Sequence, residues 1–271
     1  MTSTPTGERW RAVRVTPAIA IATSSIANPT VITTATPHGL VSGDTATIAG
    51  HTGSTPAVAG VVTVTVLTPL TFTVPLNVTV AGAGGTVTRT TPIPVIALAD
   101  AKLHARIGAD VTAEDAAAAG WTNAARQQVE TDVAQILLTE TFDVVGDAFP
   151  AGSSPIVLPF GPLASVVSIQ SYDSAAVLQT MTAVDYLADV VSQQGRIGLA
   201  DAASWPTDLR HFQPAILRVV AGYTSIAAIP EPLLQAVRLA IAWHSANREP
   251  TAMERDSYDW LIDPYRPVVV A

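Results

Sequence analysis

The chain has 271 residues, an apolar content of 48% and a formal net charge of −8 at pH 7, which is enough apolar material for one large domain or two ordinary ones. It contains no cysteine, so disulfides, thiolate nucleophiles and zinc–thiolate sites are excluded. The sequence has no apolar run long enough to span a bilayer and its first residues lack the apolar core of a signal peptide, so we expect no membrane insertion and synthesis in a cytoplasm.

Charge is distributed unevenly along the chain. Residues 1–18 carry +2, residues 19–92 hold one aspartate and one arginine, and residues 93–271 carry −10. The single lysine is Lys102. A Lys/Arg surface for phosphates is hard to assemble from this composition, which disfavours tight DNA binding. The arginines near the N-terminus are expected to pair with carboxylates of a neighbouring surface; they are Arg9, Arg11 and Arg14.

Residues 19–92 have the composition of β-sheet. They contain nineteen threonines, many valines and almost no charge. Short alternating runs such as "DTATIAG", "GVVTVTVL" and "LTFTVPL" are bounded by Gly, Pro, Asn or Asp, which predicts five or six short strands in a small sandwich or barrel. The run "GAGG" at residues 82–85 lies between two predicted strands, so it favours a turn with positive φ over a phosphate-binding loop.

The pattern becomes helical after Pro94. We expect a first helix at about residues 97–107 and a second at about 113–138, the second opened by Thr112 and Asp115 in the form of a capping box. Apolar side chains recur in the second helix at spacings of three or four and predict a packed stripe: Trp121, Ala125, Val129, Val133 and Ile136 or Leu137. The polar side is a candidate contact surface between subunits, formed by Arg126, Gln127, Glu130 and Asp132.

Strand signals return between residues 139 and 223. They predict an antiparallel meander with a hairpin turn at residues 173–176. Two prolines then open a third helix, expected at about residues 231–248. One of its faces is expected to contain Leu233, Val237, Ile241 and His244.

The last segment, residues 251–271, is predicted to be an extended C-terminal tail. Its prolines oppose helix, and three consecutive valines are typical of a strand that pairs with the sheet edge of a partner. The other interpretation is that the valines fold back onto the chain's own last strand. The candidate partner-binding residues are Pro264, Tyr265, Arg266, Pro267, Val268, Val269 and Val270.

The sequence shows no catalytic or cofactor signature. It lacks the nucleophile elbow, the Walker loop and any pair of histidines at i, i+4. The histidines lie in separate segments, and the aspartates near residues 185–208 are better explained as turn caps than as a carboxylate pair. We therefore expect no enzyme activity, no catalytic residue, no cofactor and no metal site.

The strings "PIPVIALADAKLHARI", "ETFDVVGDAFP", "LPFGPLASVVSIQSYD", "LRVVAGY", "IPEPLLQAVRLAIAWHSANRE" and "LIDPYRP", with the leader "ERWRAVRVTP", resemble in order and spacing the head-tail connector (adaptor) proteins of long-tailed phages. The pieces "GPL-x-SV" and "AGY…IPEP" are the more specific parts. The run "TPHGLVSGDTATIAG" and its continuation resemble a small β-module that recurs in phage structural proteins. The module interrupts the connector pattern between "VTPA" and "PIPV".

This resemblance implies an α+β fold. Residues 1–18 and 93–250 would form a helical connector domain with the small antiparallel meander. Residues 19–92 would form an inserted all-β sandwich or barrel module, and the tail would follow.

The implied function is that of a structural virion protein in the neck, assembled in the host cytoplasm. A ring of typically twelve copies would join the portal protein to the tail or a stopper or terminator protein. Genomic DNA would pass through the lumen during packaging and exit without specific binding, and the C-terminal tail would bind the portal.

Two alternatives stay open. One is another virion component, such as a tail completion or decoration protein. The other is a carbohydrate-binding accessory protein, although the single aromatic residue among residues 19–92, Phe72, argues against a sugar-stacking surface.

Overall fold

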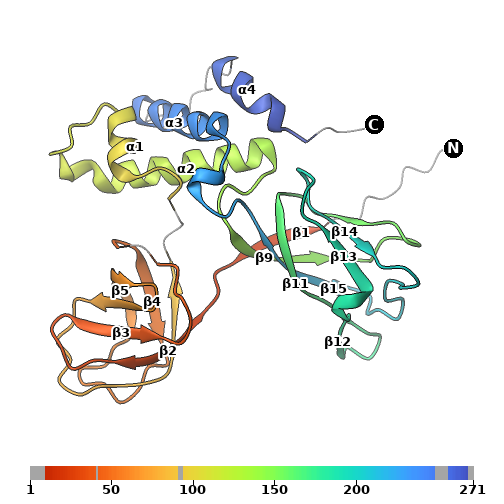
Figure 1. Cartoon of the computed structure of the whole chain (residues 1–271), viewed down its shortest axis with the longest axis horizontal. Helices are drawn as coiled ribbons and strands as arrows, with labels where there is room; N and C mark the ends of the chain where they lie inside the picture. The colour runs from red at the N-terminus through yellow and green to blue at the C-terminus, as the bar shows by residue number, and fades with distance from the viewer. Residues whose placement is uncertain (1–9, 41, 91–93, 248–255, 268–271) are drawn as a thin grey trace. The chain divides into compact units, whose positions relative to one another are not determined.

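The computed structural model describes residues 10–40, 42–90, 94–247 and 256–267. The chain divides into two compact units, one made of Met1–Val15 with Pro94–Ala271 and the other of Thr16–Ile93. The first unit combines helices with antiparallel sheets, and the second is an antiparallel barrel-like sheet, so the protein is α+β (Figure 1).

The unit Thr16–Ile93 is a seven-stranded antiparallel sheet in the order β5-β4-β8-β2-β3-β7-β6. Alternating side chains point inward, so that β3 buries Thr30, Ile32 and Thr34 in succession along one face. Its core gathers residues from most of the strands, among them Ile48, Phe72 and Val87. The strands are β2 (Ile19–Ser24), β3 (Thr30–Thr34), β4 (Thr45–Ala49), β5 (Gly60–Thr63), β6 (Thr65–Thr68), β7 (Thr71–Val74) and β8 (Thr86–Arg89).

The run "GVVTVTVL", which the alternation predicts as one strand, is divided at Val64 into β5 and β6. These halves pair with β4 and β7 at opposite edges of the sheet, so one bent segment nearly closes it. The Val64 side chain is fully buried at the bend. The turn at residues 82–85 has positive φ at Gly84 and Gly85, as predicted.

The other unit contains two sheets that the periodicity did not separate. A five-stranded sheet has the order β1-β9-β15-β11-β12, and a three-stranded sheet has the order β10-β14-β13. The predicted meander is wrong, because the last strand lies between β9 and β11 and the leader strand β1 joins the edge. The strands are β1 (Arg11–Val15), β9 (Glu140–Gly146), β10 (Ile156–Val157), β11 (Leu163–Tyr172), β12 (Leu178–Thr180), β13 (Tyr186–Asp189), β14 (Arg196–Leu199) and β15 (Ala215–Ala221). The predicted hairpin turn at residues 173–176 does connect β11 to β12.

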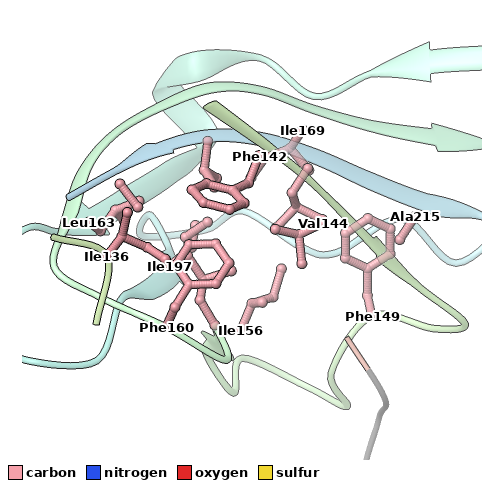
Figure 2. Close-up of a cluster of buried hydrophobic side chains, with 14 of the residues drawn as sticks. Ile136, Phe142, Val144, Phe149, Ile156, Phe160, Leu163, Ile169, Ile197 and Ala215 are labelled. Carbon is pink, nitrogen blue, oxygen red and sulfur yellow. The ribbon is translucent and has the colours of Figure 1, made fainter. Parts of the chain in front are cut away.

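A hydrophobic core joins these two sheets (Figure 2). The five-stranded sheet contributes Phe142 and Ile169, and the three-stranded sheet contributes Ile156 and Ile197. The rings of Phe142 and Phe160 lie 4.7 Å apart between their centroids. Apolar side chains on both inner faces explain why two small sheets, each with a wet outer face, stack on one another.

The described residues of this unit also form four α-helices: α1 (Leu98–His104), α2 (Asp115–Val133), α3 (Glu231–Ala246) and α4 (Asp256–Ile262). Ala125, Val129 and Val133 of the predicted stripe are fully or almost fully buried. Short 3-10 turns occur at Thr112–Glu114, Ala183–Asp185, Ile226–Ala228 and Asp263–Tyr265.

The helix boundaries differ from the predicted ones. α2 stops at Val133 because Ala134 is left-handed, which frees Gln135 to bridge to Gly161 instead of continuing to residue 138. The capping box does not form, since Thr112 lies in a 3-10 turn and α2 has no side-chain cap. Likewise, α1 ends before Arg106, which has a positive φ.

The predicted extended tail is also wrong over its described part. Residues 256–265 are helical, because Tyr258 and Ile262 bury one side of α4 and Pro264 sits in the first turn of the 3-10 helix Asp263–Tyr265, where its missing N–H costs nothing. Extended backbone begins at Arg266. Val268, Val269 and Val270 lie outside the described residues.

Candidate assembly surfaces

Two arginines and two glutamates form a buried ionic cluster where α2 meets β1 and β9. The Arg126 side chain is 1% exposed and donates to Glu130 at 2.8 Å and to Glu140 at 2.9 Å. Arg14 of β1 contacts the same two carboxylates, at 2.9 Å for Glu130. The Glu130 carboxylate also accepts the backbone N–H of Leu137, just beyond the end of α2. The cluster therefore ties the leader strand, α2 and β9 together.

This cluster corrects one sequence prediction and confirms another. The proposed contact surface of α2 is wrong for Arg126 and Glu130, because both side chains are buried, Arg126 in an ion pair with Glu140 of β9 and Glu130 in one with Arg14 of β1. Of the other two members, Gln127 is exposed, and Asp132 is half-buried and accepts the Tyr258 hydroxyl at 2.9 Å. The expected pairing of a leader arginine with carboxylates is confirmed for Arg14.

The described end of the chain is fixed to its own unit. The backbone oxygen of Tyr265 accepts from the Gln135 side chain at 2.9 Å, and that side chain accepts from the Tyr223 hydroxyl at 2.8 Å. Burial, followed by the nearby Tyr265 hydroxyl, raises the pKa of Tyr223. Tyr265 is thus engaged within the chain, and its backbone is not available as an unpaired edge.

Arg266 closes a further set of contacts with α4. Its guanidinium donates to Asp259 at 2.6 Å and also to Asp263. Burial alone would lower the pKa of Arg266, but the bond to Asp259 and the charges of Asp259, Asp263 and Asp132 outweigh it, so the pKa is raised. The cation is therefore held by its own chain.

The only lysine is buried. Lys102 Nζ donates to the backbone oxygens of Ala109 and Val111, at 3.1 and 2.8 Å, and to the Asp115 carboxylate at 2.8 Å. It secures the loop between α1 and α2 and is not available to a phosphate. Position in the sequence gave no signal of this role, which depends on how the loop turns back over α1.

α4 presents a surface that the sequence analysis did not single out. Trp260 is 77% exposed, beside a shallow groove lined by Gln235 and Leu239 of α3. The available signal was the helical spacing of Tyr258 and Ile262, which places Trp260 on the opposite, outer side.

The titratable groups raised in the sequence analysis have structural roles. In the barrel-like unit, His38 accepts the Leu40 N–H, and His51 bonds to Ser24 and to the Gly84 carbonyl. Asp189 caps the turn after β13 by accepting from Ser192 and Arg196, which holds the pKa of its carboxyl far below the usual range. No metal site is found in the described structure. Across residues 10–40, 42–90, 94–247 and 256–267, no group of three or more His, Asp or Glu side chains is arranged to hold a metal ion. Within the same ranges, no helix is long and apolar enough to cross a membrane.

The fold and these surfaces define an α+β protein whose polar clusters join its own elements and whose exposed apolar side chains lie on outer helix and strand surfaces. No protein-family model matches the chain, and no curated protein matches it. Solved structures do match. A chain from the neck of an empty gene transfer agent (GTA) particle, computed with C6 symmetry, is 28% identical with a TM-score of 0.57, and the match covers 67% of this chain and 95% of that one.

A chain from the virion of a native gene transfer agent particle gives the same identity, coverage and TM-score. A third, from the neck of a native particle computed with C12 symmetry, is 24% identical with a TM-score of 0.52 and supports the fold alone. These similarities support a structural protein located in the neck of a phage-like virion.

Proposed function

We propose that this chain is a structural protein that assembles into a ring in the virion neck and joins the portal to the tail or to a stopper protein. The observation that carries the proposal is the coverage of the match: 95% of a neck chain aligns with 67% of this one. The uncovered third is close in size to the inserted unit Thr16–Ile93. We infer a neck protein with an added module, and no catalytic role.

The charge of the chain suits a passage for DNA. Proteins that grip DNA do so with lysine and arginine side chains that displace counterions from phosphates. Here the net charge is −8, the one lysine is buried, and Arg14 and Arg126 are paired with carboxylates. Such a surface gives DNA few places to bind as it moves through a lumen.

The carbohydrate-binding alternative loses its physical basis. Phe72, the one aromatic ring of the inserted unit, is fully buried and packs edge-on against His38. A sugar-stacking platform needs an exposed ring.

Purified chain mixed with the portal protein of the same particle tests the function directly. Electron microscopy should show an added ring on the portal. A chain that stays dispersed beside bare portals, at concentrations where other neck proteins assemble, would sink the proposal.

We also propose that the last residues of the chain bind the portal by adding a strand to one of its sheets. Tyr265 and Arg266 are held by contacts within the chain, so the contact with the portal would begin at Pro267 and use the three valines that follow. Deleting residues 268–271 should leave the melting temperature unchanged and abolish portal binding in a pull-down.

A matched variant with Val268, Val269 and Val270 replaced by threonine keeps strand propensity and length. It should bind more weakly than the natural chain and more strongly than the truncated one. A truncated chain that melts earlier yet still binds the portal would show that the valines belong to the chain's own fold.

A further inference from the structure

The outer side of α4 carries acidic residues around an exposed tryptophan. Asp256, Trp260 and Asp263 follow one another at i, i+4 and i+7, with Ser257 and Leu261 beside them, and we call these five residues the α4 patch. Within the described part of the chain, Asp256 takes part in no ion pair, whereas Asp263 is paired with Arg266. An exposed tryptophan next to an apolar groove is typical of an interface anchor.

The outer side of α1 carries an apolar strip that ends in a cation. Leu98, Ala99 and Leu103 are exposed, Leu103 to 72%, and Arg106 lies two residues beyond the end of α1; we call these four residues the α1 patch. Arg106 is exposed and takes part in no ion pair among the residues described.

The two patches lie at opposite ends of one helix. Lys102 fixes α1 to Asp115, the first residue of α2, and Tyr258 fixes α4 to Asp132, near its last. Seventeen residues of α helix separate these anchor points by about 26 Å at a rise of 1.5 Å per residue. Figure 1 shows α1 and α4 toward opposite ends of the α2–α3 pair. The patches therefore cannot meet within one chain.

We propose that the α4 patch of one copy docks on the α1 patch of the next, with Trp260 against Leu103 and Arg106 facing the carboxylate of Asp256. The inference rests on the proposed ring. A cyclic assembly needs two different, complementary surfaces on every subunit. Here an acidic aromatic patch and a basic apolar patch lie on the same chain, separated along α2. A second copy of the chain would use both patches, whereas a different partner would use only one of them.

The absence of cysteine allows a direct test by thiol cross-linking of rings assembled on the portal. A double variant, Leu103→Cys with Ser257→Cys, treated with a short bis-maleimide, should give a ladder of dimers, trimers and larger oligomers. Each single variant should stay monomeric, and a mixture of the two single variants should stop at the dimer. A control pair, Val184→Cys with Ser257→Cys, places one thiol on an exposed residue of the 3-10 turn Ala183–Asp185 and should give no ladder.

Two further variants test the chemistry of the contact. Trp260→Ala should weaken self-association about thirtyfold, the usual size of a hot-spot loss, while Val184→Ala should change nothing. Arg106→Glu and Asp256→Arg should each weaken association, and the two together should restore it, because the ion pair is re-formed with its signs exchanged.

The outcomes separate this inference from the function on which it rests. Rings seen by microscopy without the cross-linked ladder would overturn the inference alone. Attachment of the Ser257→Cys thiol to another neck protein would also overturn it, since α4 would then face a different partner. A complete lack of rings would overturn the proposed function as well.

Discussion

Arg14 and Arg126 contact the same two carboxylates from very different surroundings. The Arg14 side chain is 35% exposed, whereas that of Arg126 is almost completely buried. Removing Arg126 leaves an unfilled space that water does not reach, with Arg14 as the remaining partner of both carboxylates. Removing Arg14 leaves a space that water can fill, because this side chain is partly exposed.

We therefore expect the two arginines to differ in their contribution to stability. Arg126→Met should lower the free energy of unfolding by about 3–5 kcal/mol, and Arg14→Met by about 1 kcal/mol. Urea denaturation of the unassembled chain measures both. Equal losses would show that burial does not set the strength of this cluster.

His244 gives a pH dependence whose sign can be worked out. Its Nε2 atom is buried without a hydrogen-bond partner in the described structure, and burial lowers the pKa of this imidazole from the ordinary 6.5. The unfolded chain therefore takes up a proton at a higher pH than the folded chain does. Stability should fall as the pH drops through the ordinary pKa toward the folded one.

His244→Gln removes this linkage. Between about pH 7.5 and about pH 5.5, a range that includes the ordinary pKa of histidine, the melting temperature of the variant should fall less than that of the natural chain. Thermal unfolding followed at both pH values decides the point. Parallel profiles for the two proteins would exclude a role for His244.

At the scale of elements, the loop between α1 and α2 is stabilised by polar bonds. Apart from Ile107 and Val111, its residues are small, polar or charged, and three acceptors converge on the buried ammonium of Lys102. One side chain thus replaces the apolar contacts that would otherwise hold such a loop.

Replacing this side chain should release the loop. Lys102→Met should destabilise the chain by about 2 kcal/mol, because the hydrogen bonds to a charged group are lost and Asp115 keeps access to water. Arg106→Met, four residues on and exposed, serves as the matched control and should stay within about 0.5 kcal/mol. Urea midpoints that move equally for both variants would contradict the role of Lys102.

The local sequence pattern predicted whether a segment is a helix or a strand better than it predicted which other segments that element packs against. Alternation and threonine content placed strands in residues 19–92, and the buried stripe of α2 followed from its spacing. Strand order did not follow, because the position of β15 between β9 and β11 depends on residues about fifty to eighty positions apart. The helix Asp256–Ile262 was not predicted, because the prolines and valines that follow it favour extended backbone, whereas its own helical signal is only the i, i+4 spacing of Tyr258 and Ile262. The proposed inter-subunit side of α2 failed for the same reason as the strand order, since the Arg14 that pairs with Glu130 lies more than a hundred residues away in the sequence.

At the scale of the whole molecule, the inserted unit has the structure of an independent module. Its first and last strands are neighbours, with Ile19 opposite Val87, so the chain enters and leaves the unit at nearby points. The core of the unit is formed by its own residues, from strands and from the connections between them. Insertions of this kind are tolerated when their ends lie close together.

Excision should therefore leave the remaining unit folded. Joining Val15 to Pro94 through a short Gly/Ser linker should give a soluble chain that melts cooperatively, within about 5 °C of the natural protein, and still assembles on the portal. Calorimetry and microscopy of the shortened chain check the two parts. An insoluble product would show that residues 16–93 support the larger unit.

The bend at Val64 leaves only short strands at the edges of the seven-stranded sheet. A ring holds identical subunits at a local concentration far above that in the cell, and at such concentrations exposed sheet edges act as templates for one another. Here the outermost strands, β5 and β6, are two halves of one segment and only four residues long each. Each therefore offers a neighbour a short template. In the ring that we propose, such short edges disfavour the fusion of sheets between neighbouring copies of this threonine-rich, nearly uncharged module.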